Sequence, residues 1–193
     1  FKAKAGVEYL FLASREGFLN SKGELQAFPA NKDTLVYVDF EMTPIGKPVV
    51  MERIYYDFDS AVLRRESEKE LEELVSLMEE HPEIFVELSA HTDRAGPEDY
   101  NRNLSLQRAQ SVVDYLVARG IEKERLTATG HGKSRPEIVG KSMASRHDFL
   151  KEGDVLSPGF SEQLTEEQQE IADQINRRTS FKVSGSNVGL HGR

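Results

Sequence analysis

The most constraining feature of this sequence is a regular alternation of helix-like and strand-like apolar patterns that begins near Val49. Residues 67–82, SEKELEELVSLMEEHP, space their apolar side chains as one face of a helix does. The next residues, EIFVELSAH, alternate apolar and polar side chains as a half-buried strand does. The alternation then repeats, with a helix expected from Ser105 to Gly120 and a strand in RLTATG. Such an order predicts a mixed β-sheet covered by helices, an α/β (α+β) sandwich.

The ends of the two long helices carry recognisable signals. Ser67 and Glu70 have the spacing of a capping box, and Pro82 ends the first helix. The sequence predicts Ser105 as the N-cap of the second helix, which would put Arg108 in its first turn. A cation there lies against the positive end of the helix dipole, so an anionic ligand near Arg108 would offset the unfavourable placement.

The remaining elements are less regular. VMERIYYDFD, residues 50–59, predicts a strand as far as Tyr56, and residues 137–165 have weak periodicity. A short helix in TEEQQEIADQIN and a final strand in TSFKVSG follow, and residues 184–193 are expected to be a flexible tail. We expect one domain from residue 49 to residue 183.

The first 48 residues have a different texture. VEYLFLAS and TLVYVDFEM alternate as strands do, with Gly17, Gly23 and Pro29 between them, and TPIGKP, residues 43–48, predicts a linker. Two strands cannot bury both faces of a sheet. Residues 1–48 are therefore expected to be the last strands of a truncated β-sandwich plus a linker, or a hairpin that leans on the next domain.

Composition narrows the possible partners. The net charge of -8 argues against nucleic acid or an anionic membrane as a general partner. No apolar run approaches the roughly 20 residues that span a bilayer, so no direct membrane insertion is expected. The absence of cysteine excludes disulfides and thiolate chemistry. Because residue 1 is Phe and no signal peptide is seen, we expect a fragment with targeting signals upstream.

Five motifs occur in a fixed order along the chain: IYYDFDSAVL, AHTDRAG, YNRNLSLQRAQSVVDYL, RLTATGHGKSRP and NRRTSFKV. Together they resemble the OmpA-like C-terminal domain, a periplasmic peptidoglycan-binding module, over residues 53–183. The resemblance implies a non-enzymatic domain without cofactors that binds the diaminopimelate residue of the peptide stem. It also implies a location in the periplasm, next to the outer membrane and the cell wall.

The resemblance also implies the site residues. The aspartate of HTD is Asp93 and the arginine of LSLQRA is Arg108, and they would hold the ammonium and the carboxylate of diaminopimelate. The other residues implied to line the pocket are Asp59, Thr92, Asn101 and Arg177, while one of Arg177 and Arg178 is expected to be a solvated surface charge. The sequence departs from the family pattern in three places. Ala90 precedes HTD where glycine is frequent, Asp59 stands where Asn is also common, and the segment before NRR is long.

The chemistry of the pair supports this assignment independently. A zwitterionic amino-acid head needs a fixed cation and a fixed anion a few ångströms apart. Arginine meets a carboxylate with two parallel hydrogen bonds, and an aspartate can accept from an ammonium. A simple ion pair between Asp93 and Arg108 that closes the loop is the alternative interpretation of the same residues.

Other functions remain open. One alternative is an adaptor that has the same fold but binds proteins and not glycan. Another is a metal-dependent hydrolase, because His91 and Asp93 form an HxD triplet and the sequence also contains His81, His131 and His147. No HExxH motif supports that hydrolase. TATGHGKS fails as a P-loop because Thr127 stands where glycine is required.

The segment AGVEYLFLASREGFLNSKGE resembles the last strands of carboxypeptidase-regulatory-like domains. Such domains precede OmpA-like modules in proteins that anchor the type IX secretion system to peptidoglycan. This architecture implies outer-membrane or secretion-system partners that bind through upstream domains.

Overall fold

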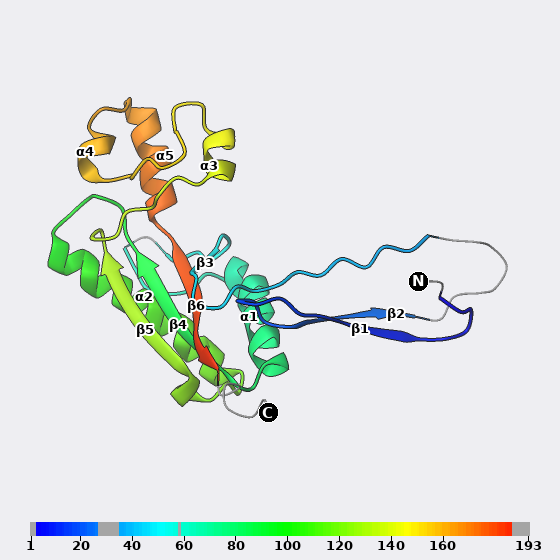
Figure 1. Cartoon of the computed structure of the whole chain (residues 1–193). Helices are drawn as coiled ribbons and strands as arrows, with labels where there is room; N and C mark the ends of the chain where they lie inside the picture. The colour runs from blue at the N-terminus through cyan, green and yellow to red at the C-terminus, as the bar shows by residue number, and fades with distance from the viewer. Residues whose placement is uncertain (1–2, 27–34, 58, 187–193) are drawn as a thin grey trace. The chain divides into compact units, whose positions relative to one another are not determined.

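The computed structural model describes residues 3–26, 35–57 and 59–186 (Figure 1). The chain divides into two compact units, Phe1–Lys47 and Pro48–Arg193. The six residues implied as a site all belong to the second unit, which is therefore the one that matters for function.

The first unit contains an antiparallel hairpin. Strands β1 (Tyr9–Ala13) and β2 (Ser21–Leu25) pair so that Phe11 lies opposite Gly23. The strand predicted for residues 34–42 is wrong over its described part, because residues 35–42 form no strand and β2 takes their place. Val38 and Phe40 instead lie where Gly23 lacks a side chain: a Cβ there would be 2.9 Å and 2.8 Å from them.

The second unit is built on a four-stranded mixed sheet in the order β3-β6-β4-β5. Its strands are β3 (Val49–Met51), β4 (Ile84–His91), β5 (Leu126–Gly132) and β6 (Thr179–Ser186). Strand β4 runs parallel to β5 and antiparallel to β6. The sheet thus brings the ends of β4 and β5 and the beginning of β6 to one edge, where the HTD and NRR motifs meet.

Helices α1 (Glu68–Glu80) and α2 (Glu98–Ala118) cover one face of this sheet (Figure 1). Strand β4 alternates buried and partly exposed residues, which is the pattern of a sheet with one covered face. The fully buried core joins both helices to the sheet through Leu71, Met78, Ile84, Val86, Leu88, Val112 and Leu116. Short 3-10 helices, Arg65–Ser67 and Lys123–Arg125, precede α1 and β5.

The predicted capping box at the start of α1 is wrong. Ser67 makes no side-chain cap and instead binds both the backbone N–H and the C=O of Tyr55, at 2.8 Å and 3.1 Å. The Glu70 carboxylate accepts from the backbone N–H groups of Glu52 and Arg53. These two side chains bind backbone groups of residues 52, 53 and 55 that would pair with a neighbouring strand if β3 were longer. This explains why β3 ends at Met51 rather than at Tyr56.

The predicted start of α2 is also wrong. The helix begins at Glu98 after Pro97, with Glu98 and Asp99 in its first turn, so Ser105 is not the N-cap. Ser105 is fully buried, donates to the Arg102 carbonyl and accepts from the Gly132 N–H at 2.8 Å. Arg108 therefore lies in the middle of α2, and the helix dipole gives no reason for its position.

Residues 137–176 form a small lobe above the sheet edge (Figure 1). It contains α3 (Lys141–Arg146), α4 (Pro158–Ser161) and α5 (Glu166–Asn176), the last with a complete capping box at Thr165. Val139, Leu150, Leu156 and Ala172 form its own hydrophobic cluster. The weakly periodic segment is thus a packed structure that ends in the helix next to NRR.

The predicted fold class is confirmed: a mixed sheet carries helices, and β-strands precede it. Strand β6 continues to Ser186, and the rest of the predicted tail, residues 187–193, lies outside the described residues.

Candidate functional site

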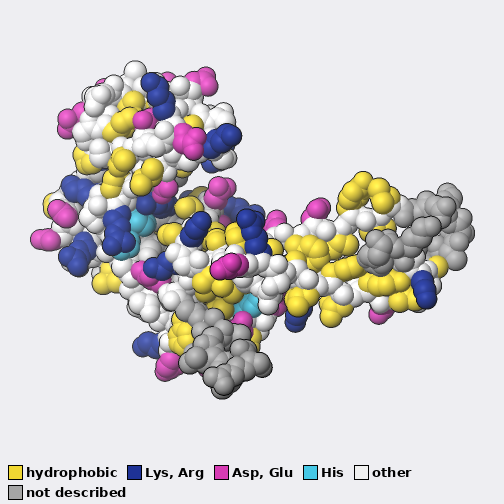
Figure 2. Space-filling view, viewed as in Figure 1, with side chains coloured by type: hydrophobic (Ala, Val, Ile, Leu, Met, Phe, Trp, Pro, Cys, Tyr) yellow, Lys and Arg dark blue, Asp and Glu magenta, His cyan; other side chains and the backbone are white. Residues whose placement is uncertain are grey.

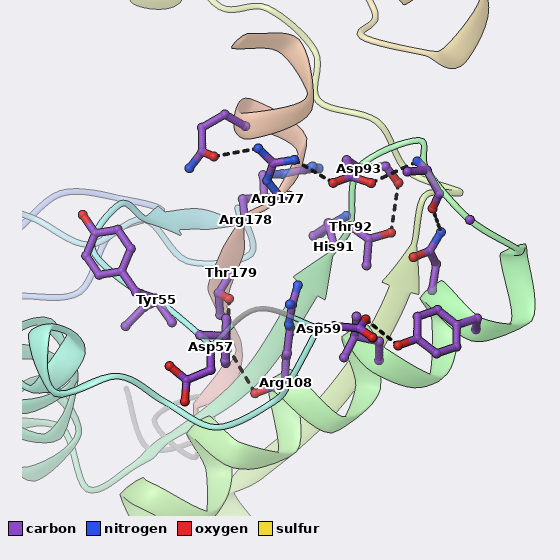
Figure 3. A pocket seen from close by; sticks show the side chains of 18 of the residues that line it. Tyr55, Asp57, Asp59, His91, Thr92, Asp93, Arg108, Arg177, Arg178 and Thr179 are labelled. Carbon is purple, nitrogen blue, oxygen red and sulfur yellow. Dashed lines mark hydrogen bonds and ion pairs between the residues drawn. The ribbon is translucent and has the colours of Figure 1, made fainter. Parts of the chain in front are cut away.

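A cavity of about 760 Å³ opens at the sheet edge between the HTD loop, α2 and α5. The six residues implied by the sequence all line it: Asp59, Thr92, Asp93, Asn101, Arg108 and Arg177. They come from four separate parts of the chain, and Figure 3 shows Arg108 pointing from α2 toward the loop that carries Asp93. The fold therefore collects these side chains around one space.

Asp93 is paired with Arg177 rather than with Arg108. The Nη1 of Arg177 donates to Oδ2 of Asp93 at 2.7 Å, and both side chains are mostly buried. The other oxygen, Oδ1, accepts from the backbone N–H of Ala95 at 3.0 Å. Arg177 also contacts Glu170 and Gln174 of α5. The carboxylate is thus held rigidly at the rim of the cavity.

Arg108 keeps much of its guanidinium available to a ligand. Its Nε donates to the Ser60 carbonyl at 2.9 Å, and its guanidinium lies over the Tyr56 ring, 5.0 Å from the ring centre. Within the described residues, no carboxylate lies within ion-pair distance of it. Burial lowers the pKa of Arg108, although Tyr56, Asp93 and Asp59 oppose that shift. An anion in the cavity would supply the missing counter-charge.

The other three residues have structural contacts beside the cavity. Asp59 has a φ of +52° and accepts a hydrogen bond from the Tyr100 hydroxyl. Asn101 is buried and donates to the Ala95 carbonyl, which fixes the end of the loop. Thr92 is buried, and its hydroxyl donates to the Asp93 carbonyl at 3.1 Å.

Sequence reasoning missed two residues that shape the cavity. The ring of Tyr56 stacks against the Arg108 guanidinium, and its hydroxyl forms a hydrogen bond with Thr179 at 3.0 Å. Burial raises the pKa of Tyr56 to about 12. Arg94, next to Asp93, donates to Asp173 and Gln169 of α5 at 3.1 Å and 2.6 Å. The motif IYYDFD could have indicated Tyr56, whereas nothing in the sequence links Arg94 to α5.

The expectation that Arg177 or Arg178 is a solvated surface charge is wrong. The side chain of Arg178 is 12% exposed and pairs with Glu137 at 2.5 Å, and Arg177 pairs with Asp93. Arg178 also donates to the Arg135 carbonyl. The small lobe supplies Glu137, so the long segment before NRR is what places Arg178 inside the protein.

The histidines of the metal hypothesis do not gather around one point. His91 and His131 lie with ring centres 4.9 Å apart. In residues 3–26, 35–57 and 59–186, no group of three or more His, Cys, Asp or Glu side chains could hold a metal ion. The P-loop-like segment forms the end of β5, where a Cβ on Gly130 would lie 2.7 Å from the Arg102 carbonyl oxygen. That glycine allows α2 to pack closely on the sheet.

Among the described helices, α2 is the longest at 21 residues, and none combines the length and apolar character needed to cross a bilayer. Acidic and basic side chains are interspersed on the face of the molecule seen in Figure 2.

Comparison with known proteins gives the family. The profile of the OmpA family matches residues 55–147. Outer membrane porin F of Pseudomonas fluorescens is 36% identical over 104 residues, which are 53% of this chain and 32% of the porin. The peptidoglycan-associated lipoprotein of Brucella melitensis is 29% identical over 90 residues, 47% of this chain and 54% of the lipoprotein.

A crystal structure of the peptidoglycan-associated lipoprotein from Burkholderia pseudomallei is 23% identical, with a TM-score of 0.48 over 67% of this chain and 86% of that one. The chain spans about a third of the porin and about half of the Brucella lipoprotein. By the match to the family profile, residues 55–147 of the second unit are an OmpA-like domain.

Proposed function

We propose that this domain binds the peptide stem of peptidoglycan and so anchors a larger protein or complex to the cell wall. The ligand group is the free amino-acid end of diaminopimelate, which carries an ammonium and a carboxylate. Arg108 binds the carboxylate, and Asp93 binds the ammonium. The function is recognition, and no chemical step belongs to it.

The observation that carries the proposal is a half-buried arginine that has no carboxylate partner among the described residues and lies beside a fixed aspartate. Arg108 has its ring support from Tyr56 and one hydrogen bond to Ser60, so its Nη groups are pre-oriented. A bidentate bond from an arginine to a carboxylate is short and strong. The name of the Brucella relative, a peptidoglycan-associated lipoprotein, supports the same ligand.

The pair between Asp93 and Arg177 is compatible with this role. A carboxylate offers about four acceptor positions, and Asp93 uses one for Ala95 and one for Arg177. The remaining positions can accept from the ligand ammonium. Arg177 then fixes the carboxylate and balances its charge in the free protein, and α5 positions Arg177 through Glu170 and Gln174.

Sedimentation with purified sacculi tests the proposal. Arg108→Ala is expected to weaken binding on the order of 100-fold, because removing one partner of a buried charged contact costs about 2–5 kcal/mol. Asp93→Ala is expected to act similarly. Arg102→Ala is the matched control, since it removes an exposed arginine from the same helix outside the cavity.

Full retention of sacculus binding by folded Arg108→Ala would contradict this role. Failure of the unmodified chain to sediment with sacculi would favour the adaptor function instead. Competition with stem peptides that carry diaminopimelate, its amidated form or lysine identifies the preferred diamino acid, because only unamidated diaminopimelate keeps both an ammonium and a carboxylate at its free end.

The proposed setting is the periplasm, between the outer membrane and the cell wall. The first unit and any upstream domains would contact an outer-membrane or secretion-system partner. The most specific candidate for that partner is the type IX secretion system. Co-purification of such a partner with the full-length protein, but not with residues 48–193, is the expected result.

A further inference from the structure

A second pocket of about 340 Å³ lies on the sheet face that α1 and α2 leave uncovered. Its floor comes from β4 and β6, where Ser89 lies opposite Ser180 and Glu87 opposite Lys182. Its wall is the segment Arg135, Pro136, Glu137 and Ile138. The first cavity shares only His91 and Arg178 with it. None of the six residues proposed for the amino-acid site lines this second pocket.

Of the three basic side chains that line this pocket, two form ion pairs within the described residues and one does not. Arg178 pairs with Glu137 and Lys182 pairs with Glu87, each at 2.5 Å. Arg135 is exposed, and among the described residues its side chain has no acidic partner. The pocket therefore has a local positive excess in a chain whose net charge is -8.

Hydrogen-bonding groups surround this excess charge. The hydroxyls of Ser89 and Ser180 have no hydrogen-bond partner among the described side chains, and the His131 ring has none either. His91 donates its Nδ1–H to the Arg135 carbonyl at 3.1 Å, and Arg178 donates to the same oxygen. These two bonds hold the backbone of Arg135 so that its position at the pocket wall is fixed.

The two histidines near this pocket also favour an anionic ligand. Burial lowers the pKa of His131, and nearby Arg135 lowers it further. Burial also lowers the pKa of His91, helped by Arg178. Both rings are therefore neutral at pH 7, and the surrounding positive charge is not matched. An anionic group in the pocket would relieve this imbalance.

We propose that this second pocket binds the carboxylate of a small organic acid, with Arg135 as its charged partner and Ser89, Ser180 and His131 as hydrogen-bond donors. Val50, Pro48 and Ile138 form an apolar side of the pocket, which can contact the body of the acid. Lactate and N-acetylmuramic acid both carry such a carboxylate, on a small body and on a sugar. The proposal does not depend on peptide-stem binding.

Titration of ¹⁵N-labelled protein with three probes tests this site by NMR. Lactate and N-acetylmuramic acid are the acids, and N-acetylglucosamine is the neutral control. We expect an acid to shift the Ser89 and Ser180 amide signals and to raise the pKa of the His131 ring, while N-acetylglucosamine does neither. A response to both acids shows that the carboxylate suffices, and a response to N-acetylmuramic acid alone shows that the sugar contributes.

Variants of Arg135 make the test specific. Arg135→Ala should weaken binding of the acid on the order of 10-fold or more, because a hydrogen bond between two charged groups is about twice as strong as one between neutral groups. Arg135→Lys should retain part of it, since the charge stays but the planar fork is lost. Arg146→Ala removes an exposed cation outside the pocket and should have no effect.

Three results would overturn the proposal: no response to either acid, an equal response to N-acetylglucosamine, or unchanged binding in Arg135→Ala. Because the readout comes from Ser89, His131 and Ser180, which do not line the first cavity, these results are distinct from a loss of sacculus binding through Arg108.

Discussion

Asp93 and Arg108 are neighbours that do not pair, and their environments explain why. Asp93 is neutralised by Arg177 of the chain segment that follows α5, whereas Arg108 rests on the Tyr56 ring and the Ser60 carbonyl. The alternative that the two simply close the loop as an ion pair does not describe this geometry. The separation leaves a cation and an anion at two sides of one cavity, as a zwitterionic guest requires.

A pH effect is expected from His91. Burial, helped by Arg178, lowers the pKa of His91 from 6.5 to about 3. Between these pH values the unfolded chain binds a proton that the folded chain does not, so stability falls as the pH decreases, by at most about 1.4 kcal/mol per pH unit. His91→Asn can keep the donor to the Arg135 carbonyl but cannot titrate.

Urea denaturation at pH 7, 6 and 5 measures this effect. The variant is expected to lose less stability than the unmodified chain between pH 7 and pH 5. Equal losses in both proteins would show that protonation of His91 is not coupled to folding.

At the scale of elements, the packing of α2 on β5 depends on glycine. A Cβ on Gly130 would meet the backbone of Leu106 and Arg102, and a helix backbone cannot move aside locally. Gly130→Ala is expected to destabilise the fold by about 1–3 kcal/mol through overpacking. Gly159→Ala is the control, because nothing lies within 4 Å of a Cβ there. Thermal unfolding compares the two, and equal melting temperatures would contradict the close approach.

The α5 helix fixes the HTD loop through two arginines, Arg94 directly after the motif and Arg177, which pairs with Asp93. Asp173 and Gln169 bind Arg94, while Glu170 and Gln174 bind Arg177. The segment before NRR therefore shapes one wall of the cavity, through a helix that packs in its own hydrophobic cluster.

At the scale of the whole molecule, the site belongs to one unit. Every residue that lines the first cavity lies at or after Ile54, and the second unit begins at Pro48. A fragment of residues 48–193 is therefore expected to fold and to bind sacculi with the affinity of the full chain. Circular dichroism and sedimentation measure the two properties. A folded fragment with much weaker binding would show that residues 1–47 contribute to the site.

The first unit exposes large apolar side chains on its hairpin. Leu10 and Leu12 of β1 are 69% and 64% exposed, and hydrophobic side chains are visible on the hairpin in Figure 2. These residues agree with the proposal that the unit is part of a larger β-structure, but they contribute nothing to the cavity.

The sequence by itself determined the elements whose apolar spacing is local: α1, β4, the buried stripe of α2, β5 and β6 follow from periods of 3.6 and 2 residues. Through the family resemblance that its motifs carry, it also implied six residues, and all six line one cavity. Only the tertiary structure decided which polar groups pair. Ser67 and Glu70 bind the segment after β3 rather than their own helix, Ser105 binds Gly132 rather than capping α2, and Asp93 binds a guanidinium 84 residues away. Periodicity reports which face of an element is buried, but a hydrogen bond depends on the neighbour that folding brings within about 3 Å, and that neighbour is not encoded locally.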